Sequence, residues 1–129
     1  MLAALAAQLG LTLHSGKRKL PDGTHVELDA ISDDPPVLVE CWSHQGPPKS
    51  AQKHKVMTDA LKLVWAEAVL FPGGARKILA LADGAAAAHF RGASWMAAAL
   101  VHLGIEVTVV DLPADVREAI RQAQVRQFR

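Results

Sequence analysis

The sequence has little cysteine: Cys41 stands alone among 129 residues, so an internal disulfide framework is excluded. Long hydrophobic runs are missing too, because no apolar stretch approaches the roughly 20 residues that a membrane-spanning helix needs. The apolar segment 1–9 lacks a basic leader and predicts a short alanine-rich helix that ends at Gly10. These features are typical of a reducing compartment, and we expect a cytoplasmic protein with no membrane partner.

The charge balance selects no partner, because a formal net charge of +1 gives no overall attraction to nucleic acid. Basic residues nevertheless gather in three segments. These are Lys17, Arg18 and Lys19; Lys49, Lys53 and Lys55; and Arg117, Arg121, Arg126 and Arg129. Such clusters fit a solvated surface as well as a phosphate-binding surface, so alone they decide nothing.

The sequence does contain the material for a core, since 50% of its residues are hydrophobic. No internal repeat or linker-like tract divides it, and we predict a single domain over residues 1–129. Alternating hydrophobicity and turn signals predict strands at 25–32, 37–43, 77–82 and 105–112. Helical spacing and capping residues predict helices at 1–9, 50–69, 94–103 and 113–127. The polar stretch 14–23 is expected to be a loop or a ragged edge strand.

This α-β-β-α-β-α-β-α order predicts an α/β fold. A hairpin comes first, and two crossover units then extend the sheet in parallel. We therefore expect a mixed β-sheet with helices on its faces. Neither Gly73-Gly74 nor Asp83-Gly84 matches a phosphate-binding loop, and no pair of histidines has the spacing of a helical zinc site.

The turn at residues 33–36 fixes the register of the predicted hairpin. If Ser32 faces Val37, counting back along both strands places Asp29 opposite Glu40. The pairs that alternate with Asp29 and Glu40 lie on the other face of the hairpin and form an apolar core face: Ala30 with Val39, Leu28 with Cys41, and Val26 with Ser43. Opposed like charges destabilise a sheet, and buried unpaired carboxylates take up a proton or need a cation. A hard divalent cation such as Mg²⁺ suits this pair; the alternative is one exposed carboxylate paired with a lysine.

Residues 27–31 (ELDAI) and 37–42 (VLVECW) resemble the PD-(D/E)XK nuclease superfamily, in which a strand ending E-x-D precedes a strand ending V-E-x-K. The chain is similar to the small stand-alone members, including Holliday-junction-resolvase-like endonucleases, and its helix, hairpin, helix, strand order is similar too. The resemblance implies a restriction-endonuclease-like fold that hydrolyses DNA phosphodiester bonds and commonly forms a homodimer. It makes Asp29 and Glu40 ligands of Mg²⁺ or Mn²⁺, with Glu27 as a further acidic member.

One departure from this pattern concerns the lysine expected two residues after Glu40, where the chain has Trp42. Some members of the fold supply this lysine from the following helix. A helical projection of residues 50–69 gives a buried stripe of Val56, Met57, Ala60, Leu61 and Val64. Lys53 falls within this stripe and is the first candidate, Lys49 is the second, and Gln52 at its border is a candidate to face the metal. Snorkelling of Lys53 toward water is the alternative.

The same projection places Lys55, Asp59 and Lys62 on the opposite side as surface pairs. His44 shares the strand face of Glu40, and Trp42 either stacks on a base or plugs the pocket.

Three functions remain. The first is a Mg²⁺-dependent endonuclease in which segments 17–19 and 49–55 bind DNA phosphates. The second is a degenerate nuclease domain that binds nucleic acid or a protein partner. The third, ranked last, is a nucleotide- or metabolite-binding module with its ligand near Asp83 and Asp111.

Overall fold

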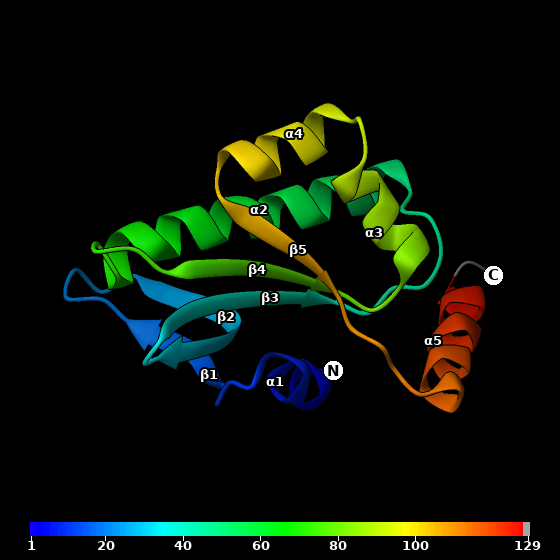
Figure 1. Cartoon of the computed structure of the whole chain (residues 1–129), viewed down its shortest axis with the longest axis horizontal. Helices are drawn as coiled ribbons and strands as arrows, with labels where there is room; N and C mark the ends of the chain where they lie inside the picture. The colour runs from blue at the N-terminus through cyan, green and yellow to red at the C-terminus, as the bar shows by residue number, and fades with distance from the viewer. Residues whose placement is uncertain (128–129) are drawn as a thin grey trace.

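The structure is a computed structural model that describes residues 1–127, so Arg129 of the third basic segment lies outside it. Five strands form one mixed sheet in the order β1-β2-β3-β4-β5, and helices flank it (Figure 1). The strands are β1 (His14–Lys19), β2 (His25–Asp33), β3 (Pro36–Trp42), β4 (Arg76–Leu81) and β5 (Ile105–Val109). The helices are α1 (Leu2–Leu9), α2 (Ser50–Leu70), α3 (Gly84–Arg91), α4 (Trp95–His102) and α5 (Ala114–Gln127). The predicted α/β class and mixed sheet are confirmed.

The predicted order lacks one strand and one helix. The polar stretch after α1, expected to be a loop or a ragged edge strand, is the edge strand β1, which pairs antiparallel with β2 and has an irregular register between His14 and Gly16. The missed helix, α3, begins in an alanine-rich segment, and alanine has the highest intrinsic helix propensity. Asp83 caps this helix, because its carboxylate accepts a hydrogen bond from the backbone N–H of Ala86 at 3.2 Å.

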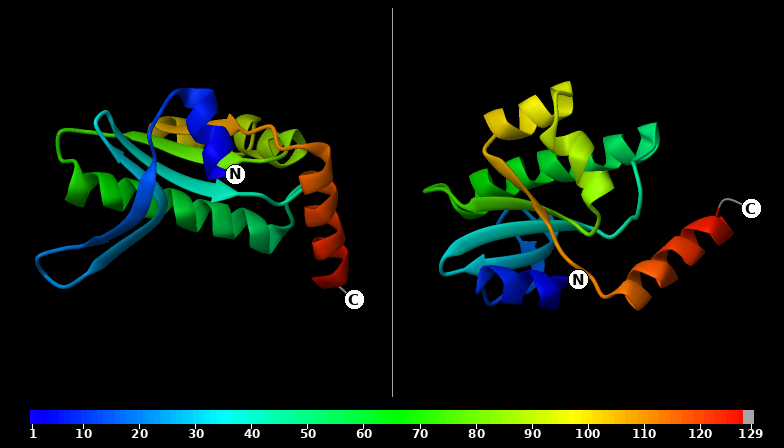
Figure 2. Two further views of the ribbon diagram at one scale, coloured as in Figure 1. Left: turned by 90° about the horizontal axis from the view of Figure 1, so that it is seen from below. Right: turned by 45° about the vertical axis from the view of Figure 1, so that its right-hand side comes forward.

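The sheet topology explains where the helices lie. β1, β2 and β3 are antiparallel neighbours, whereas β3, β4 and β5 run parallel. The crossovers from β3 to β4 and from β4 to β5 grow the sheet in one direction, so with a common hand they fall on one face. That face carries α2, α3 and α4, whereas α1 covers the other (Figures 1 and 2). A hydrophobic cluster fills each side.

A β-bulge interrupts β2 between Leu28 and Ile31, next to Asp29. His14 pairs with Ile31 and Gly16 pairs with Leu28, so two steps along β1 span three along β2. The extra residue changes the face that each side chain meets. Leu28 and Ile31 both pack in the cluster beneath α2, whereas Ala30 packs in the cluster beneath α1. The prediction that Ala30 and Leu28 share one core face is therefore wrong.

The two outer strands differ in how their free edges are covered. β5 is shielded by Arg91 of α3, whose guanidinium donates to the backbone carbonyl of Val107 at 2.6 and 3.2 Å. β1 carries the run Lys17, Arg18 and Lys19. None of the helices within residues 1–127 combines the length and the apolar character that a membrane crossing requires.

Candidate functional site

The candidate site lies where β2 and β3 separate. Their ladder runs from the turn to the pair Ala30 and Val39, and it contains the predicted pair of Ser32 with Val37. Beyond that point β2 continues beside β1, and β3 continues beside β4. The predicted register is thus confirmed as far as Ala30, but the two strands then form a fork.

Asp29 and Glu40 face this fork and bridge it with their side chains. The backbone N–H of Asp29 donates to Glu40 Oε1 at 2.8 Å, and the backbone N–H of Cys41 donates to Asp29 Oδ2 at 2.7 Å. These two bonds replace the ladder bonds that the separated strands no longer make, which satisfies two backbone donors. The predicted pairing of Asp29 with Glu40 in the ladder is wrong, because the ladder ends at Ala30 and Val39, and the two residues are joined by these side-chain bonds instead.

The two carboxylates reach the fork from opposite sides of the sheet. Glu40 is 4% exposed and packs beneath α2, where its Oε2 lies 3.3 Å from the Nζ of Lys62. Asp29 is exposed and lines a groove of about 350 Å³ beside α1. The expectation that both acids project from one face is corrected, because the bulge turns Asp29 toward the α1 side.

The charge of Glu40 is only partly neutralised. Burial, followed by repulsion from Asp29, raises the pKa of Glu40 to about 7, although Lys62 favours the ionised form. Burial also raises the pKa of the Cys41 thiol to about 12, so this cysteine is a poor nucleophile. A buried carboxylate with a raised pKa beside a second carboxylate is an arrangement that a cation would stabilise.

The helix above the site is rotated relative to its prediction. The buried residues of α2 are Val56, Asp59, Ala60, Leu63 and Ala66, whereas Leu61 of the predicted stripe is 69% exposed. Asp59 tolerates burial because Lys55 binds its carboxylate, with Nζ 2.7 Å from Oδ1. The rotation brings Lys62, predicted as a surface residue, to the carboxylate of Glu40.

The lysines and glutamine predicted to serve the site lie elsewhere. Lys53 lies near His89 of α3. Burial lowers the pKa of His89, and the positive charge of Lys53 lowers it further. Gln52 accepts a hydrogen bond from the backbone N–H of Lys49 at 2.8 Å, and its Nε2 lies 3.1 Å from His44 Nε2. These residues therefore surround the start of α2, and the helix lysine beside Glu40 is Lys62.

The remaining predicted ligand, Glu27, is exposed and faces Lys17 across the β1–β2 ladder, outside the fork. No group of three His, Cys, Asp or Glu side chains within residues 1–127 is arranged to hold a metal ion. A cation on Asp29 and Glu40 would thus need water or substrate oxygens to complete its coordination, as Mg²⁺ commonly does.

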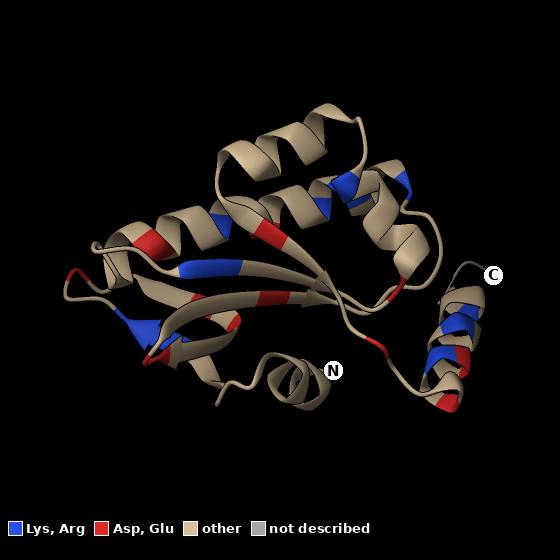
Figure 3. Cartoon of the chain, in the orientation of Figure 1, with Lys and Arg blue, Asp and Glu red and all other residues tan. Residues whose placement is uncertain are grey.

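The two predicted phosphate-binding segments do not form one surface. Segment 17–19 lies on β1, at the opposite end of the molecule from segment 49–55 at the start of α2 (Figure 3). Arg18 already binds Asp33 through two hydrogen bonds of 2.9 and 3.1 Å, and Lys55 is held by Asp59.

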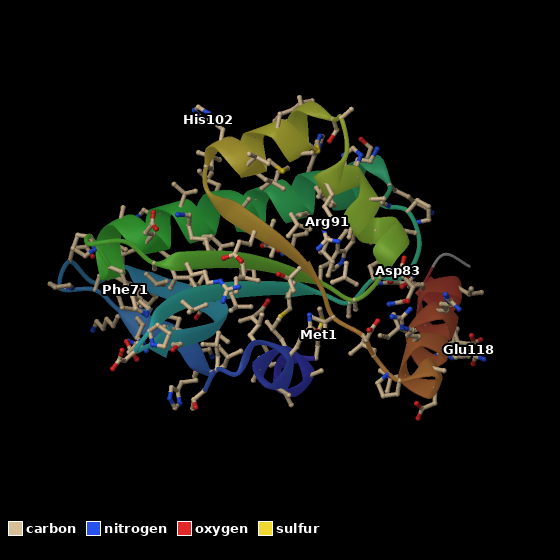
Figure 4. All side chains as sticks on the ribbon, in the orientation of Figure 1. Met1, Phe71, Asp83, Arg91, His102 and Glu118 are labelled. Carbon is tan, nitrogen blue, oxygen red and sulfur yellow. The ribbon has the colours of Figure 1, made fainter. Side chains whose placement is uncertain are left out.

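A polar cluster that the sequence did not connect lies past the end of β3. The ring of His44 stacks on Trp42, with centroids 5.1 Å apart, and its Nε2 lies 3.3 Å from the Nε2 of Gln124 in α5. Trp42 also packs against the core cluster beneath α2. The nearby Asp83, at the end of β4 (Figure 4), accepts hydrogen bonds from Gly46 and from the start of α3. Only the position of His44 on the face of Glu40 signalled this cluster, because Gln124 is 80 residues away in the sequence.

The chain matches no protein-family model, no curated protein and no solved structure.

Proposed function

We propose that this chain is a metal-dependent nuclease that hydrolyses DNA phosphodiester bonds on a restriction-endonuclease-like fold. The observation that carries the proposal is the meeting of Asp29 and Glu40 at the fork, where the backbone N–H of Asp29 donates to Glu40 Oε1 at 2.8 Å and the backbone N–H of Cys41 donates to Asp29 Oδ2 at 2.7 Å. Burial, and then repulsion from Asp29, raises the pKa of Glu40 to about 7. An antiparallel hairpin that continues into parallel strands supports the same fold. A divalent cation that both carboxylates contacted across the fork would offset the repulsion between them.

In this proposal Asp29 and Glu40 hold Mg²⁺ or Mn²⁺. Such an ion supplies an activated water and stabilises the leaving oxygen. Lys62 takes the part of the lysine that the resemblance expects two residues after Glu40, because its amine lies 3.3 Å from Glu40 Oε2 and comes from the following helix. There it balances charge on the phosphate and orients the attacking water.

A second candidate function is a nuclease-like domain that binds nucleic acid or a protein without cleaving it. Two observations favour it. Both oxygens of Glu40 are already engaged, by the backbone of Asp29 and by Lys62, and the two acids reach the fork from opposite sides. Trp42 also occupies the position of the expected lysine.

Calorimetric titration with Mn²⁺ separates the two functions. The nuclease proposal expects saturable binding that Asp29→Asn and Glu40→Gln abolish, whereas Glu118→Gln on α5 leaves it unchanged. It also expects cleavage of labelled DNA that Lys62→Met lowers by roughly 100-fold, with Lys53→Met as the matched control. Absence of Mn²⁺ binding, or binding indifferent to both fork substitutions, refutes the nuclease and leaves the binding domain.

A further inference from the structure

A cleft of about 670 Å³ separates α5 from the loop that joins β3 to α2. Its volume falls within the range of sites that hold small ligands. The charged side chains among its lining residues are Lys49 and Arg121, and none of those residues is a carboxylate. Pro47 and Val125 provide apolar wall. The lining therefore suits an anion that carries an apolar or aromatic portion.

The polar side chains around the cleft are fixed in orientation. Gln124 Oε1 accepts from the backbone N–H of Gln45 at 2.8 Å, and its Nε2 donates to the carbonyl of Gln45 at 3.1 Å. The amide of Gln52 is oriented in the same way by the backbone N–H of Lys49. Both NH₂ groups lie near the ring of His44, with the Nε2 atoms of Gln52 and Gln124 at 3.1 and 3.3 Å from His44 Nε2. An arrangement fixed by backbone groups is preorganised for a ligand.

Gln45, one of the residues that line the cleft, has a buried and unsatisfied side-chain acceptor. The side chain is 4% exposed, and its Oε1 has no hydrogen-bond partner in the described part of the chain. Its Nε2 is used by the carbonyls of Ser43 and Ala82, so only the oxygen is unsatisfied. Buried acceptors without a donor are uncommon in folded proteins.

The position of the cleft relates it to the fork. Glu40, Trp42 and His44 follow one another at every second position along β3 and its extension. Four residues of extended chain span about 13 Å. At about 3.4 Å of rise per nucleotide, that distance corresponds to only a few nucleotides of a strand. A strand that contacts the fork can thus extend to the cleft.

We propose that the cleft between residues 44–49 and α5 is a binding subsite for the phosphate of a nucleotide in a nucleic-acid strand. Arg121 offers the planar pair of donors that matches a phosphate, and Lys49 adds a second positive charge. The aromatic or apolar part of the nucleotide packs against Val125. The proposal rests on the nucleic-acid partner of the proposed function and adds a contact outside the fork.

Fluorescence anisotropy of a short labelled single-stranded DNA, measured in EDTA, tests this subsite without metal binding or cleavage. Arg121→Gln should weaken binding at least fivefold and lower the salt dependence by about one phosphate contact. Arg126→Gln is the matched control, because it removes the same charge from the same helix at a residue that does not line the cleft. This substitution should change the affinity less than twofold. Equal effects of the two substitutions overturn the subsite.

Competition with a free nucleoside monophosphate identifies the source of the phosphate. The monophosphate is used at a concentration at which it binds wild type but not Arg121→Gln. If it displaces DNA from wild type at that concentration, the subsite is supported and also binds free nucleotides. If neither DNA nor monophosphate binds wild type, the subsite is refuted. Because EDTA removes any metal, a failure of Mn²⁺ binding at the fork would not affect this result.

Discussion

Replacing Glu40 with glutamine should change how the stability of the folded protein depends on pH. Burial beneath α2 and the charge of Asp29 hold the pKa of Glu40 near 7, against an ordinary value of 4.5. The folded state therefore binds a proton more tightly than the unfolded state. The contribution of Glu40 to the unfolding free energy therefore falls as pH rises from about 4.5 to about 7. Above that range the whole contribution has been lost. A glutamine side chain cannot ionise, so Glu40→Gln lacks this loss.

The size of the effect follows from that pH interval. Converted at about 1.4 kcal/mol per pH unit, the interval sets an upper limit of about 3.5 kcal/mol. Solvent at the exposed Asp29 weakens the repulsion, and glutamine gives up the contact with Lys62, so we expect a gain of roughly 1–2 kcal/mol near pH 8. Near pH 5 the variant should be no more stable than wild type, because the wild-type carboxyl is then largely protonated.

Urea denaturation followed by tryptophan fluorescence, in EDTA and at several values between about pH 5 and pH 8, measures this difference. Glu27→Gln is the matched control, since it makes the same change on an exposed part of β2 and should give a difference independent of pH. A stability difference between wild type and Glu40→Gln that stays constant over this range would refute the raised pKa. The charge imbalance on which the metal site depends would be refuted with it.

Two further substitutions test the scaffold. Glu67→Ala should lower the unfolding free energy by roughly 3 kcal/mol and Glu67→Gln by less, because Lys77 is buried and its Nζ lies 2.8 Å from Glu67 Oε2. A loss below about 1 kcal/mol in urea denaturation would show that Lys77 finds another partner. Gly16→Ala should cost roughly 3 kcal/mol, since its Cβ would lie 2.2 Å from the backbone oxygen of Leu28 at the bulge. Gly73→Ala, which meets open space, should be nearly neutral, and equal thermal shifts for the two would contradict the bulge geometry.

The sequence predicted the sheet and the hairpin well because their signals are local. The turn at residues 33–36 sets the pairing of Ser32 with Val37, and the alternation that follows holds as far as Ala30. The bulge after Ala30 has no such signal, because it depends on how β1 pairs with β2 over a longer range. A single inserted residue reverses the face of every later side chain, so the prediction for Asp29 names the wrong side of the sheet.

The orientation of α2 departs from its prediction for a different reason. A projection based on hydrophobicity favours Leu61 over Asp59, but the structure buries Asp59 and exposes Leu61. Lys55 makes this burial tolerable through its ion pair, which no periodicity of apolar residues reveals. Because of this error, the projection named Lys53 as the helix lysine beside Glu40, whereas the structure places Lys62 there. The cluster around His44 was out of reach for a similar reason, since it needs α5 to fold back on the chain.

The outer edges of β1 and β5 are protected against pairing with a strand of another copy of this protein. The guanidinium of Arg91 occupies a backbone acceptor of β5, and successive positive charges repel a second copy of β1. Growth by recruiting one more strand, the route to fibres and to continuous intermolecular sheets, is disfavoured at both ends. An assembly of two copies is then expected to form through surfaces other than these two strand edges.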